Sequence, residues 1–415
     1  MDKRIRLVLT ILFLDVVIGT AISPIVPEFV KHLPYPSFML GLGMGLFTGM
    51  QLFSSTILGV LSDKFGRRPM FMLSAAGTLF FNLVLFPMRA STYFINRAGD
   101  GVTNGIYTAI NSAIADISPK EEYYKNIGFE GAAASIGVII GPALSGALLA
   151  VLPFSEKINF QLLILVICTL AAFNFFLCWS MPETHQALPE TPHKFNVSEL
   201  KTVVSENIDP RKLWAKITEK ASNRPVLKQL VVMRFLLALS MGYYFYYVNY
   251  LSLGALQMTP VAIAYNFMYF GAVNVLSTYL FFTFWAEKLN KRRAIFVLSL
   301  LGVGIHIWYA NVGTSVFSVY AVTTVDCFTL SYIGGLLEGM LASQTTDTDR
   351  GEIFGISQGL NSLANFLTTI IFTLLSLISP EMPFYWFGAA IAVVAYMGLK
   401  LPKTELVPAS NSIHS

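Results

Sequence analysis

Residues 59–69 have the sequence Gly-Val-Leu-Ser-Asp-Lys-Phe-Gly-Arg-Arg-Pro, a short charged loop between two apolar runs. The runs on either side, 38–61 and 69–88, are each long enough to supply the roughly 20 residues that a helix needs to cross a bilayer. One acid and three bases fall between them, where the chain would re-enter water. This stretch therefore predicts two membrane-spanning helices joined by a tight polar turn.

The same alternation of apolar runs and short polar loops continues along all 415 residues. The chain is 54% hydrophobic and only 13% charged, whereas a soluble domain carries about 25% charged residues. A soluble fold would lack the polar surface to cover such a core. The sequence predicts an all-α integral membrane protein with twelve transmembrane helices, at 7–30, 38–61, 69–88, 91–117, 124–152, 158–180, 227–254, 260–286, 293–310, 314–342, 352–379 and 382–401.

A polar segment, 181–226, interrupts these spans after the sixth. It is rich in Pro, Glu and Lys, and contains one surface helix near Pro210–Lys220. The predicted organisation is an N-terminal six-helix bundle at 1–180, a linker at 181–226, a C-terminal six-helix bundle at 227–401 and a tail at 402–415.

Lys and Arg residues predict the orientation of these helices. They concentrate at the N-terminus, in the linker, at the C-terminus and in alternate loops, whereas the opposite loops carry only Lys31, Arg89 and Lys157. Loops rich in Lys and Arg stay in the cytoplasm. Both termini and the linker are therefore expected on the cytoplasmic side, in agreement with an even number of spans.

The charged loop has a counterpart in the second half. Residues 63–68 are Asp-Lys-Phe-Gly-Arg-Arg after the second span, and residues 287–292 are Glu-Lys-Leu-Asn-Lys-Arg after the eighth. The order acid, Lys, apolar, any residue, base, base recurs at the same place in each half. Duplicated halves are typical of secondary transporters, whose substrate site lies near the middle of the membrane.

Several motifs resemble those of the major facilitator superfamily. Residues 59–69 resemble the signature loop between its second and third helices, and 97–105 resemble its fourth-helix motif. Residues 137–146 resemble the fifth-helix motif of antiporters, with Ser145 in place of one glycine. Leu14-Asp15, followed by Pro24 and Pro27, is similar to the first helix of tetracycline/proton antiporters. The resemblance implies two pseudo-symmetric six-helix bundles, alternating access and the drug/proton antiporter branch.

The resemblance stops in the third span, where Phe80, Phe81 and Asn82 stand in place of the acid of tetracycline pumps. Tetracycline is therefore not the expected substrate. The fifth-helix motif nevertheless implies export, and small residues let neighbouring helices approach closely. Its residues here are Gly137, Gly141, Pro142 and Gly146.

The signature loop is expected to form a conformational lock. Asp63 lies at a helix end, where a carboxylate can accept from the amides at the N-terminus of a neighbouring helix; the resemblance suggests the eleventh helix, near Gly351. Arg67 or Arg68 would pair with Asp116. The alternative is a solvated turn that only sets topology. The lock residues are Gly59, Asp63, Gly66, Arg67, Arg68 and Asp116.

Charged residues inside the spans indicate a functional role, because each costs roughly 2.5–3.5 kcal/mol at the helix centre on insertion scales. The leading proton-coupling candidates are Asp100 and Glu130, then Asp15, with Arg97 one turn from Asp100 and able to pair with it. Glu130 shares a face with Gly137 and Gly141, where the two halves would meet. The alternatives are a structural Arg97–Asp100 pair and a snorkelling Asp15. His306, the one histidine inside a span, is expected at the membrane interface.

Polar stripes are expected to line a substrate cavity. On span four, at 100° per residue, the polar residues share one arc with Arg97 and Asp100. Span seven has a tyrosine stripe and span eleven an amide stripe, although tyrosines also form interfacial belts. Such groups suit an amphiphilic ligand. The expected cavity residues are Asn104, Tyr107, Asn111, Tyr243, Tyr247, Tyr250, Gln358, Asn361 and Asn365.

These features favour a proton-coupled antiporter that exports small amphiphilic molecules through the inner (plasma) membrane. No enzyme, metal or nucleic-acid motif is visible, and the proton gradient replaces any cofactor. A monomer with a small-molecule substrate, protons and lipid as its partners is expected. Two alternatives stay open: proton-coupled uptake of a nutrient, siderophore or metabolite, and a non-transporting membrane receptor.

Overall fold

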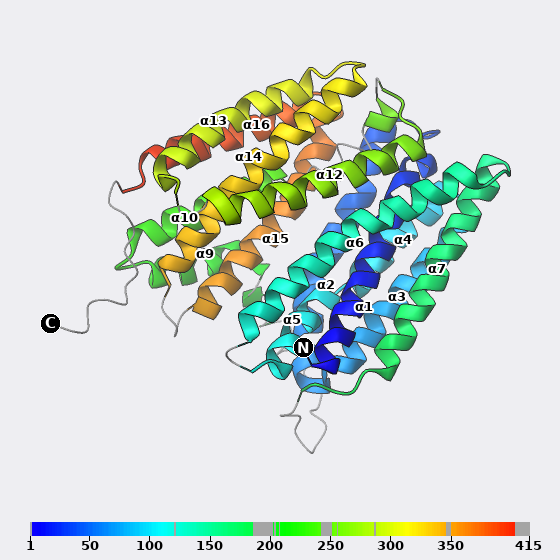
Figure 1. The fold of residues 1–415 in the computed structure, drawn as a ribbon, viewed down its shortest axis with the longest axis horizontal. Helices are drawn as coiled ribbons and strands as arrows, with labels where there is room; N and C mark the ends of the chain where they lie inside the picture. The colour runs from blue at the N-terminus through cyan, green and yellow to red at the C-terminus, as the bar shows by residue number, and fades with distance from the viewer. Residues whose placement is uncertain are drawn as a thin grey trace. The chain divides into compact units, whose positions relative to one another are not determined.

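A computed structural model describes residues 2–119, 122–185, 202, 205–206, 208–241, 251–254, 256–285, 288–345 and 350–402. Every regular element in these residues is helical (Figure 1). In chain order they are α1 Lys3–Ala21, η1 Ser23–Phe29, α2 Pro36–Phe65, α3 Arg67–Val84, α4 Ala90–Thr103, α5 Ile106–Ile117, α6 Tyr123–Val151, α7 Glu156–Ser180, α9 Pro210–Lys220, α10 Pro225–Met241, α12 Pro260–Leu280, η2 Phe281–Trp285, α13 Lys291–Ala310, α14 Val316–Ser343, α15 Arg350–Leu375 and α16 Met382–Leu399.

Most predicted spans match one helix within a few residues, and the predicted surface helix is α9. Among the described residues, nine helical segments are long and apolar enough to cross a membrane. The other predicted spans do not meet this length and hydropathy requirement, each for a local reason. α3 begins with two arginines, the fourth span is broken into α4 and α5, and the description of α10 stops at Met241.

The break in the fourth span corrects the prediction of one continuous helix over 91–117. α4 ends at Thr103 and α5 begins at Ile106. The Ser54 hydroxyl on α2 donates to the carbonyls of Gly101 at 2.7 Å and Asn104 at 3.3 Å. Irregular backbone at membrane depth is tolerated where protein groups satisfy it. The single polar arc that was predicted across this span is therefore interrupted.

The chain divides into two compact units by its internal contacts. The first contains residues 1–204 and 245–271, and the second contains 205–244 and 272–415. Residues 245–271 belong to the predicted C-terminal bundle by chain order, but α12 packs on α6 through Gly146 and Gly271. The predicted bundle boundaries stay a prediction.

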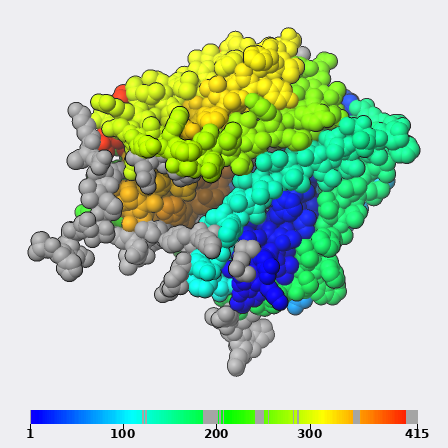
Figure 2. All heavy atoms as spheres, viewed as in Figure 1, coloured from blue at the N-terminus to red at the C-terminus, as the bar shows by residue number. Residues whose placement is uncertain are grey.

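In the first unit, α1 lies between α6 and α7, blue between cyan and green in Figure 2. Glycines make the contact with α6 close. A Cβ on Gly137 would lie 2.8 Å from the Cβ of Val16, and one on Gly141 would lie 2.6 Å from the Val17 carbonyl. α1 ends before Pro24 and Pro27, and the Ser145 hydroxyl donates to the carbonyl of Ala21 at that end. Ser145, which replaces a glycine of the antiporter motif, thus supplies a hydrogen-bond donor to a carbonyl group at the end of α1.

In the second unit, α13 packs against α14 and α16, and α10 packs against α14, α15 and α16. Leu213 and Ile217 anchor α9 in the same apolar core as α10 and α14. Asn290 begins α13, where its side chain accepts from the backbone N–H of Arg293 at 3.0 Å. The repeated loop therefore uses an Asn cap in this half, and its acid, Glu287, lies outside the described residues.

Candidate functional site

The charged loop forms a network at one end of the first unit. The Nε of Arg67 donates to Asp116 at 2.9 Å, and its Nη1 donates to the Ser62 hydroxyl at 3.1 Å and to Asp63. The Arg67 side chain is only 6% exposed, whereas that of Asp63 is 65% exposed. Asp116 is therefore the more enclosed partner, and of the two arginines it is Arg67 that pairs with it.

The tight turn before α3 depends on Gly66. Its φ of +98° lies where side chains are rarely tolerated, and an added Cβ would lie 2.8 Å from the carboxyl carbon of Glu183. The carboxylate of Glu183 accepts from the backbone N–H of Arg67 at 2.8 Å and of Arg68 at 3.1 Å. A carboxylate is favourable here because the first amides of a helix have no partner within it.

Glu183 is the residue that the sequence analysis missed. The predicted arrangement, an acid on the amides that open a helix, exists within the first unit, but the acid is Glu183 and the helix is α3. The capping of the eleventh helix by Asp63 stays a prediction, because α15 belongs to the second unit. The available signal was an acid directly after Met181-Pro182, where the sixth apolar run ends.

Burial of Glu183 would by itself raise the pKa of its carboxyl, but the backbone N–H groups of His185, Arg67, Arg68 and Thr184 outweigh it and hold that pKa below its usual value of 4.5. A lowered folded-state pKa stabilises the fold above the unfolded-state value, and this stability is lost as the pH falls through the folded-state pKa. Glu183 is only partly removed from water and the residue as a whole is exposed, so the effect is modest.

We expect Glu183→Gln to lower the stability of the folded protein by about 1 kcal/mol at neutral pH, because the negative charge at the helix start is lost. Below pH 4.5, wild type should lose stability progressively and approach the variant. Thermal unfolding in detergent at a series of pH values measures both effects. Glu219→Gln, an exposed glutamate on α9, is the control; an equal pH dependence in wild type and Glu183→Gln would contradict the assignment.

A second polar cluster lies inside the membrane-crossing part of the first unit. With its amide nitrogen turned to the carboxylate, Asn111 on α5 donates to both oxygens of Glu130 on α6, at 2.7 and 3.1 Å. Tyr107, one turn before Asn111, lies within electrostatic reach of Glu130 and of Asp15 on α1. Tyr107 is 41% exposed, whereas Asp15 is only 8% exposed. Three helices thus place two carboxylates within electrostatic reach of one phenol, and one of them, Glu130, accepts from an amide.

The structure excludes the snorkelling alternative for Asp15 and shows which contacts the Glu130 face of α6 makes within the first unit. Asp15 is 8% exposed and cannot snorkel to a membrane interface. Glu130 faces Asn111 within its own unit, and Gly137 and Gly141 pack on α1, so this face of α6 is used inside the first unit. The cause is the close contact of α1 and α6 through glycine, which brings their polar residues toward α5.

The predicted Arg97–Asp100 pair is not formed. The Arg97 Nε donates to Asn96 at 2.8 Å, and its guanidinium lies 5.4 Å from the centre of the Phe47 ring. Arg97 stays within electrostatic reach of Asp100, which accepts a long 3.5 Å hydrogen bond from Thr78. Among the described residues, no cation lies within ion-pair distance of Asp15, Asp100 or Glu130.

The remaining cavity residues stay predictions, and the structure shows the surroundings of some of them. Asn104 lies at the helix break, and its side-chain oxygen accepts from Gln51 at 3.1 Å. Gln358 and Asn365 on α15 are exposed and Asn361 is half-buried. The predicted tyrosines of span seven, Tyr243, Tyr247 and Tyr250, lie outside the described residues.

The second unit holds a buried polar group that the sequence analysis placed elsewhere. His306 is completely buried, so its predicted position at the membrane interface is wrong. Its Nδ1 lies 2.7 Å from the Gly302 carbonyl. One turn away, the Tyr309 hydroxyl donates to the buried Asp326 at 2.7 Å. Packing of α13 against α14 and α16 encloses all three side chains.

Residues 8–281 match the description Major Facilitator Superfamily. The chain belongs to this family. Members of the Major Facilitator Superfamily are transporters, so the chain is a multi-pass membrane transporter and not an enzyme. The predicted fold class is thereby confirmed, and the receptor alternative is not supported.

The chain is similar in sequence to several drug-resistance proteins. The chain is 33% identical to tetracycline resistance protein class H of Pasteurella multocida over 153 residues, 36% of this chain and 38% of that protein. It is 23% identical to tetracycline resistance protein class E of Escherichia coli, covering 96% and 95% of the two chains. It is 25% identical to multidrug resistance protein 2 of Bacillus subtilis (strain 168), covering 90% and 88%.

Solved structures of other transporters share the fold of this superfamily protein. A D-xylose–proton symporter gives a TM-score of 0.70 at 16% identity, with 97% of this chain and 98% of that chain covered. The human organic anion transporter MFSD10 (TETRAN) gives 0.67 at 16% identity, with 96% and 100% covered. At these identities the likeness concerns the fold alone.

Proposed function

We propose that this superfamily member is a proton-coupled antiporter that exports small amphiphilic molecules by alternating access. The observation that carries the proposal is the group of three carboxylates, Asp15, Asp100 and Glu130, on membrane-crossing helices of the first unit. No described cation pairs with them, and a buried acid without a counter-charge is less costly when protonated. Reversible protonation of these groups would couple proton entry to substrate exit.

Export is favoured by the relatives and by the α1–α6 contact. Relatives that cover most of this chain are named for tetracycline and multidrug resistance, and Gly137, Gly141 and Pro142 form the motif that resembles the one in antiporters. Phe80, Phe81 and Asn82 still distinguish the third span from that of tetracycline pumps, so the proposed substrate is another amphiphile. The Lys and Arg bias supports cytoplasmic termini in a plasma or inner membrane.

Exposed polar residues support the proposal of an amphiphilic substrate. Tyr107 and Asn111 on α5 of the first unit expose a phenol and an amide, and Gln358 and Asn365 on α15 of the second unit expose amides. Such surfaces bind molecules with one apolar body and a few polar groups. No group of three or more His, Cys, Asp or Glu side chains in the described part of the chain is placed to hold a metal ion.

The proposal predicts pH-driven accumulation of substrate in everted membrane vesicles. A thermal-shift screen of the purified protein against drugs, amino acids, siderophores and metals would first identify a ligand. When the vesicle interior is acidified, an antiporter is expected to concentrate that ligand inside, and an ionophore that collapses the pH gradient should release it. A proton-coupled uptake system would instead lose ligand from acidified everted vesicles, which would favour the alternative function.

A further inference from the structure

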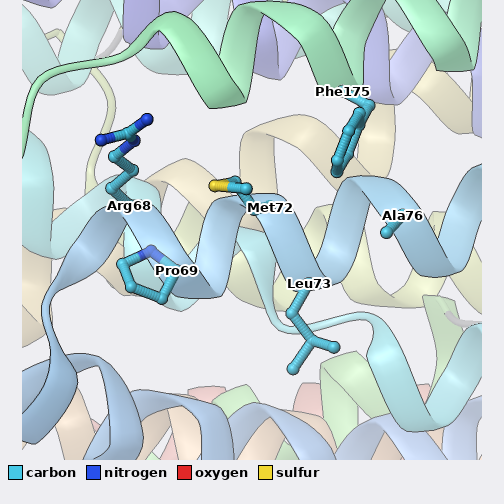
Figure 3. A pocket seen from close by; sticks show the side chains of 6 residues that line it. All are labelled: Arg68, Pro69, Met72, Leu73, Ala76 and Phe175. Atoms are coloured by element: carbon cyan, nitrogen blue, oxygen red, sulfur yellow. The ribbon is translucent and has the colours of Figure 1, made fainter.

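We infer that the groove between α3 and α7 of the first unit binds an anionic phospholipid. The groove has a volume of about 520 Å³ and is lined by Arg68, Pro69, Met72, Leu73, Ala76 and Phe175. Figure 3 shows Arg68 and Ala76 at opposite ends, with Phe175 reaching from α7 toward α3. Apart from Arg68, every lining side chain is apolar, so the groove suits a hydrocarbon chain.

The surface around the groove is suited to contact lipid. On α3, Leu73 is 43% exposed and Phe80 is 60% exposed; on α7, Phe176 is 62% exposed and Trp179 is 57% exposed. Large exposed apolar side chains on both helices are suited to contact with lipid in a membrane-spanning chain. Trp179, whose ring meets Phe175 edge to face at 6.3 Å between centroids, lies in the last turn of α7, where a tryptophan is typical of the headgroup level.

Arg68 supplies the preference for negative charge. Arg67 beside it is neutralised by Asp63 and Asp116, but no carboxylate of the described residues forms an ion pair with the guanidinium of Arg68, and Glu183 accepts from its backbone N–H. Its Nη2 donates to the Trp179 carbonyl at 2.6 Å, and its Nε is buried without a hydrogen-bond partner. Since a guanidinium has five N–H donors, this half-buried side chain keeps donor capacity for a phosphate. The cation lies at the loop end of the groove, where a lipid headgroup would lie.

Trp179 gives a direct test in the full-length chain. With Trp214, Trp285, Trp308 and Trp386 replaced by Phe, the protein is reconstituted in neutral bilayers that contain small amounts of brominated phosphatidylglycerol or brominated phosphatidylcholine. We expect the brominated phosphatidylglycerol to quench Trp179 at roughly fivefold lower mole fraction, the factor that corresponds to about 1 kcal/mol for one arginine near an anionic headgroup. Arg68→Gln should remove this preference while both lipids still quench.

Ala76→Phe, which fills the groove, should reduce the quenching by phosphatidylglycerol to the level of phosphatidylcholine. Leu165→Phe, an exposed site farther along α7, is the matched control and should change nothing. Equal quenching by both lipids in the parent protein would overturn the inference, as would a preference that survives in Arg68→Gln or Ala76→Phe. Displacement of the brominated lipid by inorganic phosphate would indicate a simple anion site. Quenching that appears only on dilution into excess lipid would indicate that a second copy of the chain covers the groove. Either result would overturn the inference.

Discussion

Arg67→Met is expected to abolish transport and to lower the stability of the first unit by about 2–4 kcal/mol, the largest loss in the charged network. The guanidinium is 6% exposed and joins α2 and α3 to α5 through Asp63 and Asp116. Its removal leaves Asp116 without its cation and Ser62 without its donor. The loss is smaller than the 3–5 kcal/mol of fully enclosed pairs, because Asp63 is largely solvated. Thermal unfolding in detergent and flux in vesicles measure the two effects.

Three variants separate this role from a general effect of charge. Arg67→Lys keeps the charge but cannot reach both carboxylates in the same planar geometry, so it should restore only part of the stability. Arg68→Met removes a neighbouring guanidinium that forms no ion pair with any carboxylate of the described residues, and it should leave the unfolding temperature nearly unchanged. In a double-mutant cycle, Arg67→Met and Asp116→Asn should be strongly non-additive. Additive losses would show that the two side chains do not act as a pair.

Asp63→Asn tests the lock itself. Exposed ion pairs contribute about 0–1 kcal/mol, so this change should cost little stability. Reduced transport with an unchanged unfolding temperature would therefore indicate a role in switching between conformations. Transport at the wild-type rate would leave the loop as a topology signal only.

The positions of the helices could be predicted because lipid imposes a simple requirement on the sequence. A span needs a long apolar run, and each such run was visible between polar loops. The break at Asn104–Gly105 was not predictable by the same means. Gly is frequent in continuous membrane helices, and the group that stabilises the break, Ser54, belongs to another helix and is 50 residues away in the sequence.

The candidate site was only partly predictable because its contacts depend on packing between helices. Periodicity places Arg97 and Asp100 one turn apart, yet Asn96 and Phe47 hold the guanidinium elsewhere. A pairing of Arg67 or Arg68 with Asp116 could be proposed from the positions of these charges at neighbouring helix ends, but the sequence left open which of the two arginines forms it. The contact with Glu183 could not, since it joins residues 116 positions apart and no periodicity relates them.

Hydropathy also could not distinguish a buried histidine from an interfacial one. His306 lies near the end of a predicted span, where an amphipathic side chain commonly meets the headgroups. Packing of Phe387 on α16 near its ring encloses it instead. Its burial, together with that of Asp326 and Tyr309, depends on which face of α13 meets α14 and α16.

Asp15, Asp100 and Glu130 form no ion pair with any cation in the described part of the chain, so their protonation can be tested by removing the charge. Glu130→Gln keeps a side chain of the same shape that can still bond to Asn111, but it cannot change its charge. Asp15→Asn is the equivalent change beside Tyr107, and Asp100→Asn the equivalent change near Thr78. If protonation drives the empty carrier between its states, removing the titrating group should stop coupling while the substrate still binds.

We therefore expect Glu130→Gln or Asp100→Asn to reduce pH-driven flux by a factor of at least about 10, equivalent to 1.4 kcal/mol, with substrate binding by calorimetry still measurable. Glu156→Gln, an exposed glutamate at the start of α7, is the matched control and should transport normally.

Because Asp15 and Glu130 both lie near Tyr107, a single proton shared by this cluster would make Asp15→Asn equally damaging. The Asp15→Asn/Glu130→Gln double variant would then be no worse than either single variant. Retained pH-driven flux in Glu130→Gln and Asp100→Asn would exclude both as coupling residues and direct attention to Asp15 and Asp326. A wild-type protein that does not respond to a pH gradient would instead contradict the proton antiport mechanism, because every assigned role of these acids requires a proton that moves.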